Sequence, residues 1–92
     1  DVLGAVVEVA SGMRFGEFLQ KRIFSPLSMN DTGFYQPDAK KSRLMHLYTQ
    51  RSPDAPMTRH PDFAEENYPV AGAKTYESGG AGLSSTVQDY AK

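Results

Sequence analysis

Serine is the residue of this sequence best suited to covalent chemistry, because the 92 residues contain no cysteine. A serine becomes a strong nucleophile when a lysine lies one helical turn after it, in the pattern S-x-x-K. The residue at that position is arginine after Ser11, methionine after Ser42 and glutamine after Ser85. The strained G-x-S-x-G turn is also absent. The sequence therefore predicts no catalytic residue within this chain.

Two short patterns near residue 76 imitate catalytic motifs. Tyr76-Glu77-Ser78 resembles a tyrosine that transfers protons beside a polar neighbour, but no partner motif lies nearby. Lys74-Thr75 begins like K-T-G, yet Tyr76 follows, and its bulk prevents the close backbone approach that glycine permits. We interpret both patterns as coincidences.

Ion-binding sites receive equally little support. Gly80-x-Gly82 precedes a helical pattern and resembles an anion site at a helix N-terminus, but a tight turn explains these glycines more simply. His60 and Asp62 could share a metal only in an extended loop, and His46 lies far from both in the sequence. We predict surface histidines, no metal site and no cofactor.

The composition is that of an ordinary soluble domain, with 39% apolar and 23% charged residues and a formal net charge of -1. No basic patch interleaved with aromatic residues is present, which argues against a nucleic-acid partner. The longest apolar run near the start is far shorter than the roughly 20 residues that span a bilayer. No signal-peptide pattern is visible, and the chain starts with Asp1 rather than Met, so we expect residue 1 to be a cut point.

Residues 1–11 are predicted to form an amphipathic helix. Valines would also suit a strand, but Gly12 supplies a helix stop and Asp1 suits a first turn. The apolar residues recur with helical spacing, at Leu3, Val6, Val7 and Ala10.

A second helix is predicted from Phe15 to Phe24. Glu17 lies near its positive end, and Pro26 ends it by removing a backbone donor. Its apolar stripe consists of Phe15, Phe18, Leu19 and Ile23. We expect the two helices to pack as a hairpin through their apolar stripes. Together with a tight turn at Asn30–Gly33, this hairpin is expected to form the region 1–35.

Residues 36–78 show no sustained periodicity and contain most of the prolines. We predict an irregular, weakly β insertion, with residues 46–49 as its best strand. Residues 79–92 read as a glycine-rich loop and the start of a helix. Ser85 and Gln88 fit a capping box, and the helix is so short that a truncation is expected. Its predicted apolar face consists of Leu83, Val87, Tyr90 and Ala91.

Two blocks of the sequence resemble one family. LGAVVEVASGMRFGEFLQKRIFSPLSMNDTGFY is similar to the segment after the tyrosine motif in serine hydrolases related to class C β-lactamases, D-alanyl-D-alanine carboxypeptidases and β-lactamase-like esterases. Ser28 departs from the usual glycine before methionine. The matching residues are Leu3-Gly4, Ala10-Ser11-Gly12, Phe18-Leu19, Ile23-Phe24, Pro26-Leu27, Met29 and Asp31-Thr32. The second block, GGAGLSSTVQDYAK, is similar to G-G-x-G-L-x-S-T-x-x-D-x-A of the same family.

The resemblance implies an α/β parent fold of the β-lactamase/transpeptidase type, of which these residues form a mainly helical piece. It implies that S-x-x-K lies well before residue 1, Y-x-N/S a few residues before it, and the K-T-G or H-x-G strand beyond Lys92. The part expected near the substrate cleft is the loop Ser78, Gly79, Gly80, Ala81 and Gly82, which would shape the cleft wall.

For the parent protein the resemblance implies acyl-enzyme chemistry on a β-lactam, D-peptide or ester, and a periplasmic or secreted bacterial location. Its partner would be a small-molecule or peptidoglycan-like substrate. Two alternatives are a non-catalytic relative that binds peptidoglycan or peptides, and a complete small interaction module. Because apolar helix faces would lack their covering sheet, self-association of the isolated chain is also expected.

Overall fold

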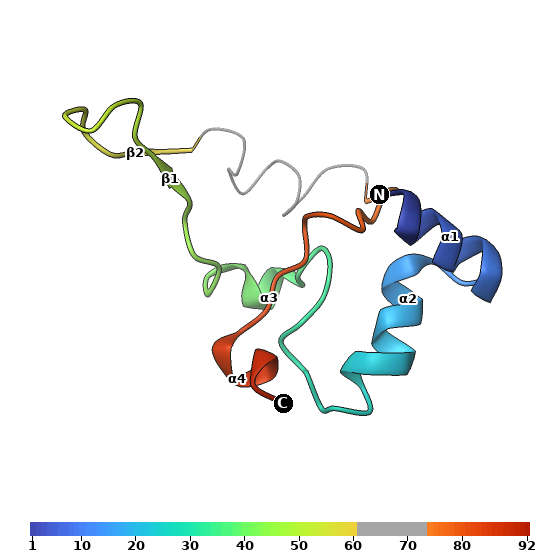
Figure 1. The fold of residues 1–92 in the computed structure, drawn as a ribbon. Helices are drawn as coiled ribbons and strands as arrows, with labels where there is room; N and C mark the ends of the chain where they lie inside the picture. The colour runs from blue at the N-terminus through green and yellow to red at the C-terminus, as the bar shows by residue number, and fades with distance from the viewer. Residues whose placement is uncertain (61–73) are drawn as a thin grey trace.

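The computed structural model describes residues 1–60 and 74–92, which are mainly helical with one small antiparallel sheet (Figure 1). The elements in chain order are α1 (Val2–Ser11), α2 (Phe15–Leu19), the π-helix η1 (Gln20–Phe24), α3 (Asp38–Lys41), β1 (Tyr48–Thr49), β2 (Thr58–Arg59) and α4 (Val87–Tyr90). This agrees with the predicted fold of the segment. The region boundaries at residues 35 and 78 stay a prediction.

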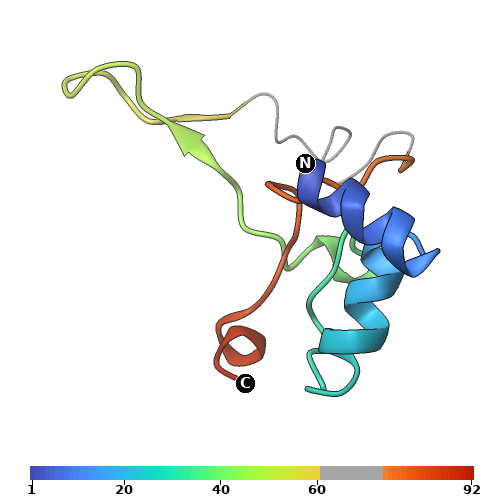
Figure 2. The same ribbon diagram turned by 45° about the vertical axis from the view of Figure 1, so that its right-hand side comes forward.

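The N-terminal helical hairpin is present, with α1 beside α2 in both ribbon views (Figures 1 and 2). Gly12 ends α1 in the left-handed conformation, at φ 67°, as its glycine predicts. The second helix covers the predicted range but changes character at Gln20. There the backbone widens to a π-helix, and the Ser25 amide donates to the Gln20 carbonyl at 2.9 Å just before Pro26.

The predicted packing of α1 through its apolar stripe is wrong for Leu3 and Val6, whereas Val7 and Ala10 line one hollow together with Phe18 of α2. Leu3 is 78% exposed and Val6 56% exposed, whereas the buried residue of α1 is Gly4. A Cβ atom on Gly4 would lie 3.4 Å from the Gly79 amide nitrogen, so the bare glycine face lets the C-terminal segment approach. In the described part of the chain, Phe24 is the one buried apolar side chain.

The turn after η1 contains a residue in an unfavourable backbone conformation. Ser28 has φ 55°, in the left-handed region that glycine adopts without steric cost. The Met29 amide nevertheless donates to the Phe24 carbonyl at 2.7 Å, so the surrounding hydrogen bonds hold this conformation. The family pattern has glycine where Ser28 stands, and the geometry explains why glycine suits this position.

Replacing Ser28 with glycine should therefore stabilise the chain by ~0.5–1 kcal/mol, because the left-handed conformation loses its steric cost. Thermal unfolding followed by circular dichroism would show a midpoint a few degrees higher. Gly12→Ser is the matched control: no neighbouring atom lies within 4 Å of its Cβ position, so only the backbone at φ 67° opposes it, and the midpoint should fall. An unchanged or lower midpoint for S28G would contradict the prediction.

The middle of the chain forms a short hairpin that projects from the body of the molecule (Figures 1 and 2). The strand predicted at residues 46–49 is confirmed in part, as β1, and Tyr48 pairs with Arg59 of β2. The helix α3 was not predicted; Asp38 at its start forms an ion pair with Lys41 at 2.6 Å, which lowers the pKa of Asp38. The rest of the predicted insertion, 61–73, lies outside the described residues.

The predicted capping box of the last helix is wrong by one residue. Thr86, not Ser85, is the N-cap of α4, and its hydroxyl accepts the Asp89 amide at 3.1 Å. The predicted apolar face is also wrong, since Val87 is 85% and Tyr90 86% exposed while Asp89 is buried. Both differences involve Asp89. Its amide donates to the Thr86 hydroxyl, which makes Thr86 the cap, and its carboxylate accepts hydrogen bonds from Asp31 and Thr32, which places it inward.

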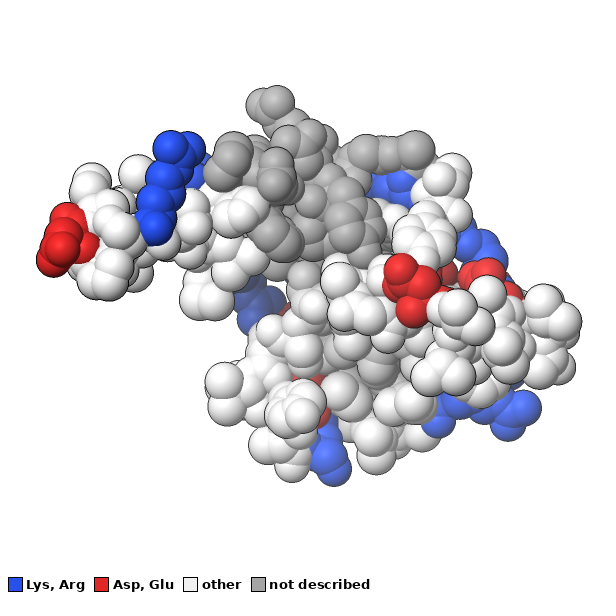
Figure 3. All heavy atoms as spheres, turned by 45° about the horizontal axis from the view of Figure 1, so that its top comes forward, with Lys and Arg blue, Asp and Glu red and all other residues white. Residues whose placement is uncertain are grey.

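Charged side chains lie scattered among uncharged ones on the face drawn in Figure 3. Large apolar residues are exposed on α1 and α4. Exposed apolar surface favours association, and self-association of the chain stays a prediction. Within residues 1–60 and 74–92, the helices are too short or too polar for any to traverse a bilayer.

Candidate functional site

The loop Ser78–Gly82, predicted to border a substrate cleft, is organised around one hydroxyl group. Ser78 is buried, and its Oγ accepts hydrogen bonds from the amides of Gly80 at 3.0 Å and Ala81 at 3.1 Å. The same hydroxyl donates to Oδ1 of Asp1. The two loop amides that could contact an anion thus serve Ser78 instead, which supports the tight-turn interpretation of the glycines.

Glycine in this loop permits close contact with the start of α1. A Cβ atom on Gly79 would lie 3.2 Å from the Gly4 amide nitrogen, tighter than most real contacts. Together with the hydrogen bond from Ser78 to Asp1, this contact fixes the loop against the first turn of the helix. In Figures 1 and 2 the C-terminal segment passes beside the N-terminus, in agreement with these distances.

A hollow of about 320 Å³ lies between this loop and α2. Apolar side chains of Phe15, Leu19 and Phe34 line it opposite the loop backbone. The rings of Phe15 and Phe34 are 5.9 Å apart and tilted by 49°. An apolar wall facing a glycine-rich backbone offers shape and van der Waals contact, and the Ser78 hydroxyl, whose residue also lines the hollow, is hydrogen-bonded to Asp1.

The motif lookalikes have structural roles. Lys74 accepts a hydrogen bond on its carbonyl from Nη2 of Arg14 at 3.1 Å, and the carbonyl of Tyr76 accepts one from the Tyr35 hydroxyl. Tyr76 is 55% exposed. These contacts hold the backbone of the segment, and its lack of catalytic residues stays a prediction.

Residues from the two sequence blocks meet in a polar cluster that we call the clasp. It consists of Asp31, Thr32, Gly33, Ser84, Ser85 and Asp89. Gly33 and Ser84 form an antiparallel bridge, with N···O distances of 3.0 and 3.1 Å. The hydroxyl oxygens of Thr32 and Ser85 lie 2.7 Å apart.

Asp89 is the centre of the clasp. Its Oδ2 accepts the Asp31 amide at 2.7 Å and the Thr32 hydroxyl at 3.0 Å, and its Oδ1 accepts Nζ of Lys92 at 3.1 Å. Burial by itself raises the pKa of Asp89, but the hydrogen bonds from Asp31, Lys92 and Thr32 outweigh it and lower the pKa. The carboxylate is therefore held in its charged form as a structural acceptor.

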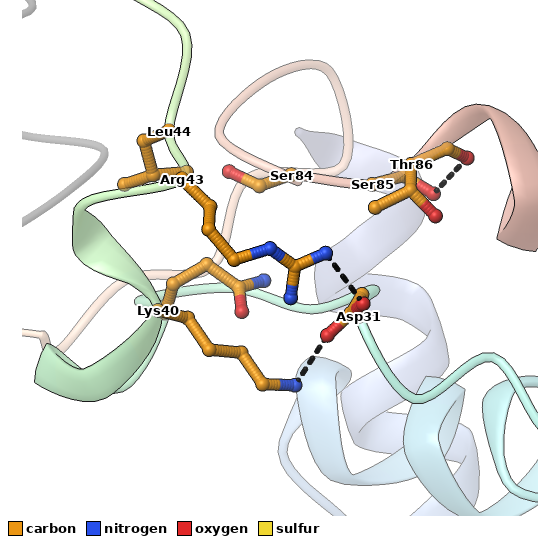
Figure 4. A pocket seen from close by; sticks show the side chains of 8 residues that line it. Asp31, Lys40, Arg43, Leu44, Ser84, Ser85 and Thr86 are labelled. Atoms are coloured by element: carbon orange, nitrogen blue, oxygen red, sulfur yellow. Dashed lines mark hydrogen bonds and ion pairs between the residues drawn. The ribbon is translucent and has the colours of Figure 1, made fainter.

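Asp31 extends the clasp to α3 (Figure 4). Its carboxylate accepts Nη2 of Arg43 at 2.9 Å and Nζ of Lys40 at 2.7 Å. These two cations, Arg43 first, lower the pKa of Asp31 to about 2. The adjoining cavity, about 60 Å³ between Arg43 and the serines of the clasp, has room for little more than water.

The described residues include both histidines but only part of the weighed metal pair, His60 and Asp62. His46 is exposed and His60 half-buried, and Asp62 lies outside the described residues. Nowhere in residues 1–60 and 74–92 do three His, Asp or Glu side chains gather in a metal-binding arrangement.

Sequence reasoning missed the roles of Asp89, Glu77 and Arg14. The spacing of Thr86 and Asp89 was a usable signal, since an acidic residue three positions after a hydroxyl also fits a helix start. Glu77 and Arg14 pair at 3.2 Å across a separation of 63 residues, and no local pattern carries such information.

The family model described as Beta-lactamase matches residues 1–92. The chain belongs to the Beta-lactamase family. Membership of this family supports, at the family level, a parent protein of the serine hydrolase type. A comparison with curated proteins gives no match. Each of the two sequence blocks that resemble the Beta-lactamase family contributes three residues to the clasp.

Proposed function

We propose that these residues are a supporting part of a serine hydrolase that acts through an acyl-enzyme on a β-lactam, D-peptide or ester. The loop Ser78–Gly82 forms part of its cleft wall. The observation that carries this role is the contact of Ser78 with Asp1 and of Gly79 with Gly4. Because the family resemblance puts the proton-transferring tyrosine a few residues before Asp1, a loop fixed on this turn lies near the reacting groups.

The proposed reaction uses groups outside this sequence for every covalent step. A serine hydroxyl attacks the substrate carbonyl, a lysine/tyrosine pair accepts its proton and delivers a proton to the leaving group, and water then releases the acyl group. Backbone amides would stabilise the oxyanion. Residues 1–92 contribute the scaffold and one wall. We propose a peptidoglycan-like or small-molecule substrate and a periplasmic or secreted location.

The 92-residue chain itself should neither hydrolyse a chromogenic cephalosporin or a p-nitrophenyl ester nor become acylated by a fluorescent penicillin. Its serines lack an activating lysine, and the Ser78 hydroxyl is already bonded to Asp1. Gel fluorescence and mass spectrometry after incubation would check this, with an active class C β-lactamase as positive control. Stoichiometric, saturable labelling of one serine in the chain would overturn the expectation.

The hydrolase itself is tested on the complete gene product that contains residues 1–92. We expect turnover of at least one of the three substrate classes, with a mass increase on a serine outside this sequence. Absence of both turnover and adduct for a β-lactam, a D-alanyl-D-alanine peptide and an ester would contradict the proposal and favour the binding relative.

A further inference from the structure

Residues Lys74–Ser78, which we call the strap, lead directly into the proposed cleft loop. Successive positions of the strap are tied to different parts of the N-terminal half. Arg14 holds the Lys74 carbonyl, Tyr35 holds the Tyr76 carbonyl, and Asp1 accepts the Ser78 hydroxyl. Lys74 itself has φ 54°, a conformation that needs such support.

Glu77 provides the strongest tie. Its Oε2 accepts the Gly16 amide at 2.6 Å, and its Oε1 pairs with Nη2 of Arg14 at 3.2 Å. The Glu77 side chain is only 11% exposed, whereas Arg14 is 54% exposed, so the carboxylate is the inner partner. Charge-assisted hydrogen bonds of this kind are stronger than neutral ones.

The surroundings of Glu77 are shaped for a carboxylate. A Cβ atom on Gly16 would lie 2.8 Å from Oε1 of Glu77, so the approach depends on glycine at that position. The neighbouring amide of Phe15 is accepted at 2.8 Å by Oε1 of Glu8. Two acidic side chains thus satisfy consecutive amides at the start of α2, where the helix has no carbonyl partners for them.

We propose that Glu77 is a positioning residue for the cleft wall: its contacts with Gly16 and Arg14 fix the strap and thereby set the place of the Ser78–Gly82 loop. Both carboxylate oxygens are occupied, so Glu77 acts through the loop rather than on the reacting atoms. The consequence for substrate binding rests on the proposed function. The consequence for loop order does not.

Loop order is tested by amide hydrogen exchange on the 92-residue chain. Glu77→Ala should accelerate exchange of the Gly80 and Ala81 amides about 10-fold, because their acceptor Ser78 loses its fixed position. Glu77→Gln, which keeps an oxygen for Gly16, should give a smaller effect. Glu17→Gln, on the exposed side of α2, is the matched control and should leave exchange unchanged.

The Ser84 amide reports on the distant clasp, through its hydrogen bond to Gly33, and should keep its protection in Glu77→Ala. Unchanged exchange at Gly80 and Ala81 would overturn the proposal. So would equal acceleration at Ser84, because Glu77 would then only stabilise the whole chain.

Substrate positioning is tested on the complete hydrolase. Glu77→Ala should raise KM about 10-fold with kcat within about 2-fold, because it disturbs a binding wall and not the chemistry. Glu77→Gln should recover most of the affinity, and Glu17→Gln should match the wild type. A fall in kcat at constant KM, or no change in either, would overturn positioning. If the wild type hydrolyses nothing, the proposed function fails, while hydrogen exchange still decides the role of Glu77.

Discussion

Replacing Asp89 with alanine should lower the unfolding midpoint of the chain by roughly 10 °C, the largest effect of any single substitution we expect. The carboxylate accepts the Asp31 amide and the Thr32 hydroxyl, and Asp89 is only 5% exposed. Alanine would leave the half-buried Asp31 amide without its acceptor and the buried Thr32 hydroxyl with Ser85 as its remaining partner, and an unmet donor costs more than the hydrogen bond itself contributes. Thermal unfolding followed by circular dichroism measures the change.

Two further variants separate hydrogen bonding from charge. Asp89→Asn keeps one acceptor oxygen but places an amide group next to donors, so its midpoint should fall between those of the wild type and Asp89→Ala. Asp54→Asn changes an exposed carboxylate in the projecting hairpin and should leave the midpoint within about 1–2 °C of the wild type. If Asp89→Ala unfolds at the same temperature as Asp54→Asn, the contacts of Asp89 with residues 31 and 32 do not stabilise the chain.

Acid should destabilise the chain through the same cluster. Hydrogen bonds with Arg43 and Lys40 lower the pKa of Asp31 from 3.8 to about 2, and the pKa of Asp89 is also lowered. A carboxylate with a lowered folded-state pKa binds its proton more readily when unfolded. Its stabilisation is therefore complete above the unfolded value, and it is lost as the pH falls from about 4 through about 2.

Urea unfolding at a series of pH values measures this loss. We expect a flat midpoint from pH 7 to 5 and a steep fall below pH 4. In Asp31→Asn the fall should be shallower, because this variant removes one of the protonation steps. Since Asp31 is partly exposed, 1 M salt should weaken its contribution. A wild-type curve that parallels that of Asp31→Asn down to pH 2 would contradict the assignment.

Local sequence patterns predicted the parts of the structure that local chemistry determines. Gly12 ends α1 because a left-handed residue is needed there, and Pro26 follows the last turn of the second helix. The turn at the glycine-rich loop was likewise readable, since Ser78 and the following glycines suit a tight turn. Family resemblance supplied the rest of the correct fold prediction.

The burial of each element could not be predicted in this way. Helical spacing shows that Leu3 and Val6 share a face, but not whether another element covers it. Likewise Val87 and Tyr90 looked like a core face, while the buried contact is made by Asp89 with partners more than fifty residues away in the sequence. The ties of Glu77 to the start of α2 are equally distant. Such contacts depend on tertiary arrangement, which neither propensity nor periodicity encodes.

The clasp has a consequence for the lengths that this chain can tolerate. Asp31 and Asp89 are joined across 58 positions, and the projecting hairpin β1–β2 lies between them. Doubling the length of a flexible loop costs only about 0.6 kcal/mol of closure entropy. Residues added to or removed from the hairpin would thus barely affect closure of the clasp. A change of length in the projecting hairpin should therefore leave the segment that carries Ser84 and Asp89 docked on residues 31–33.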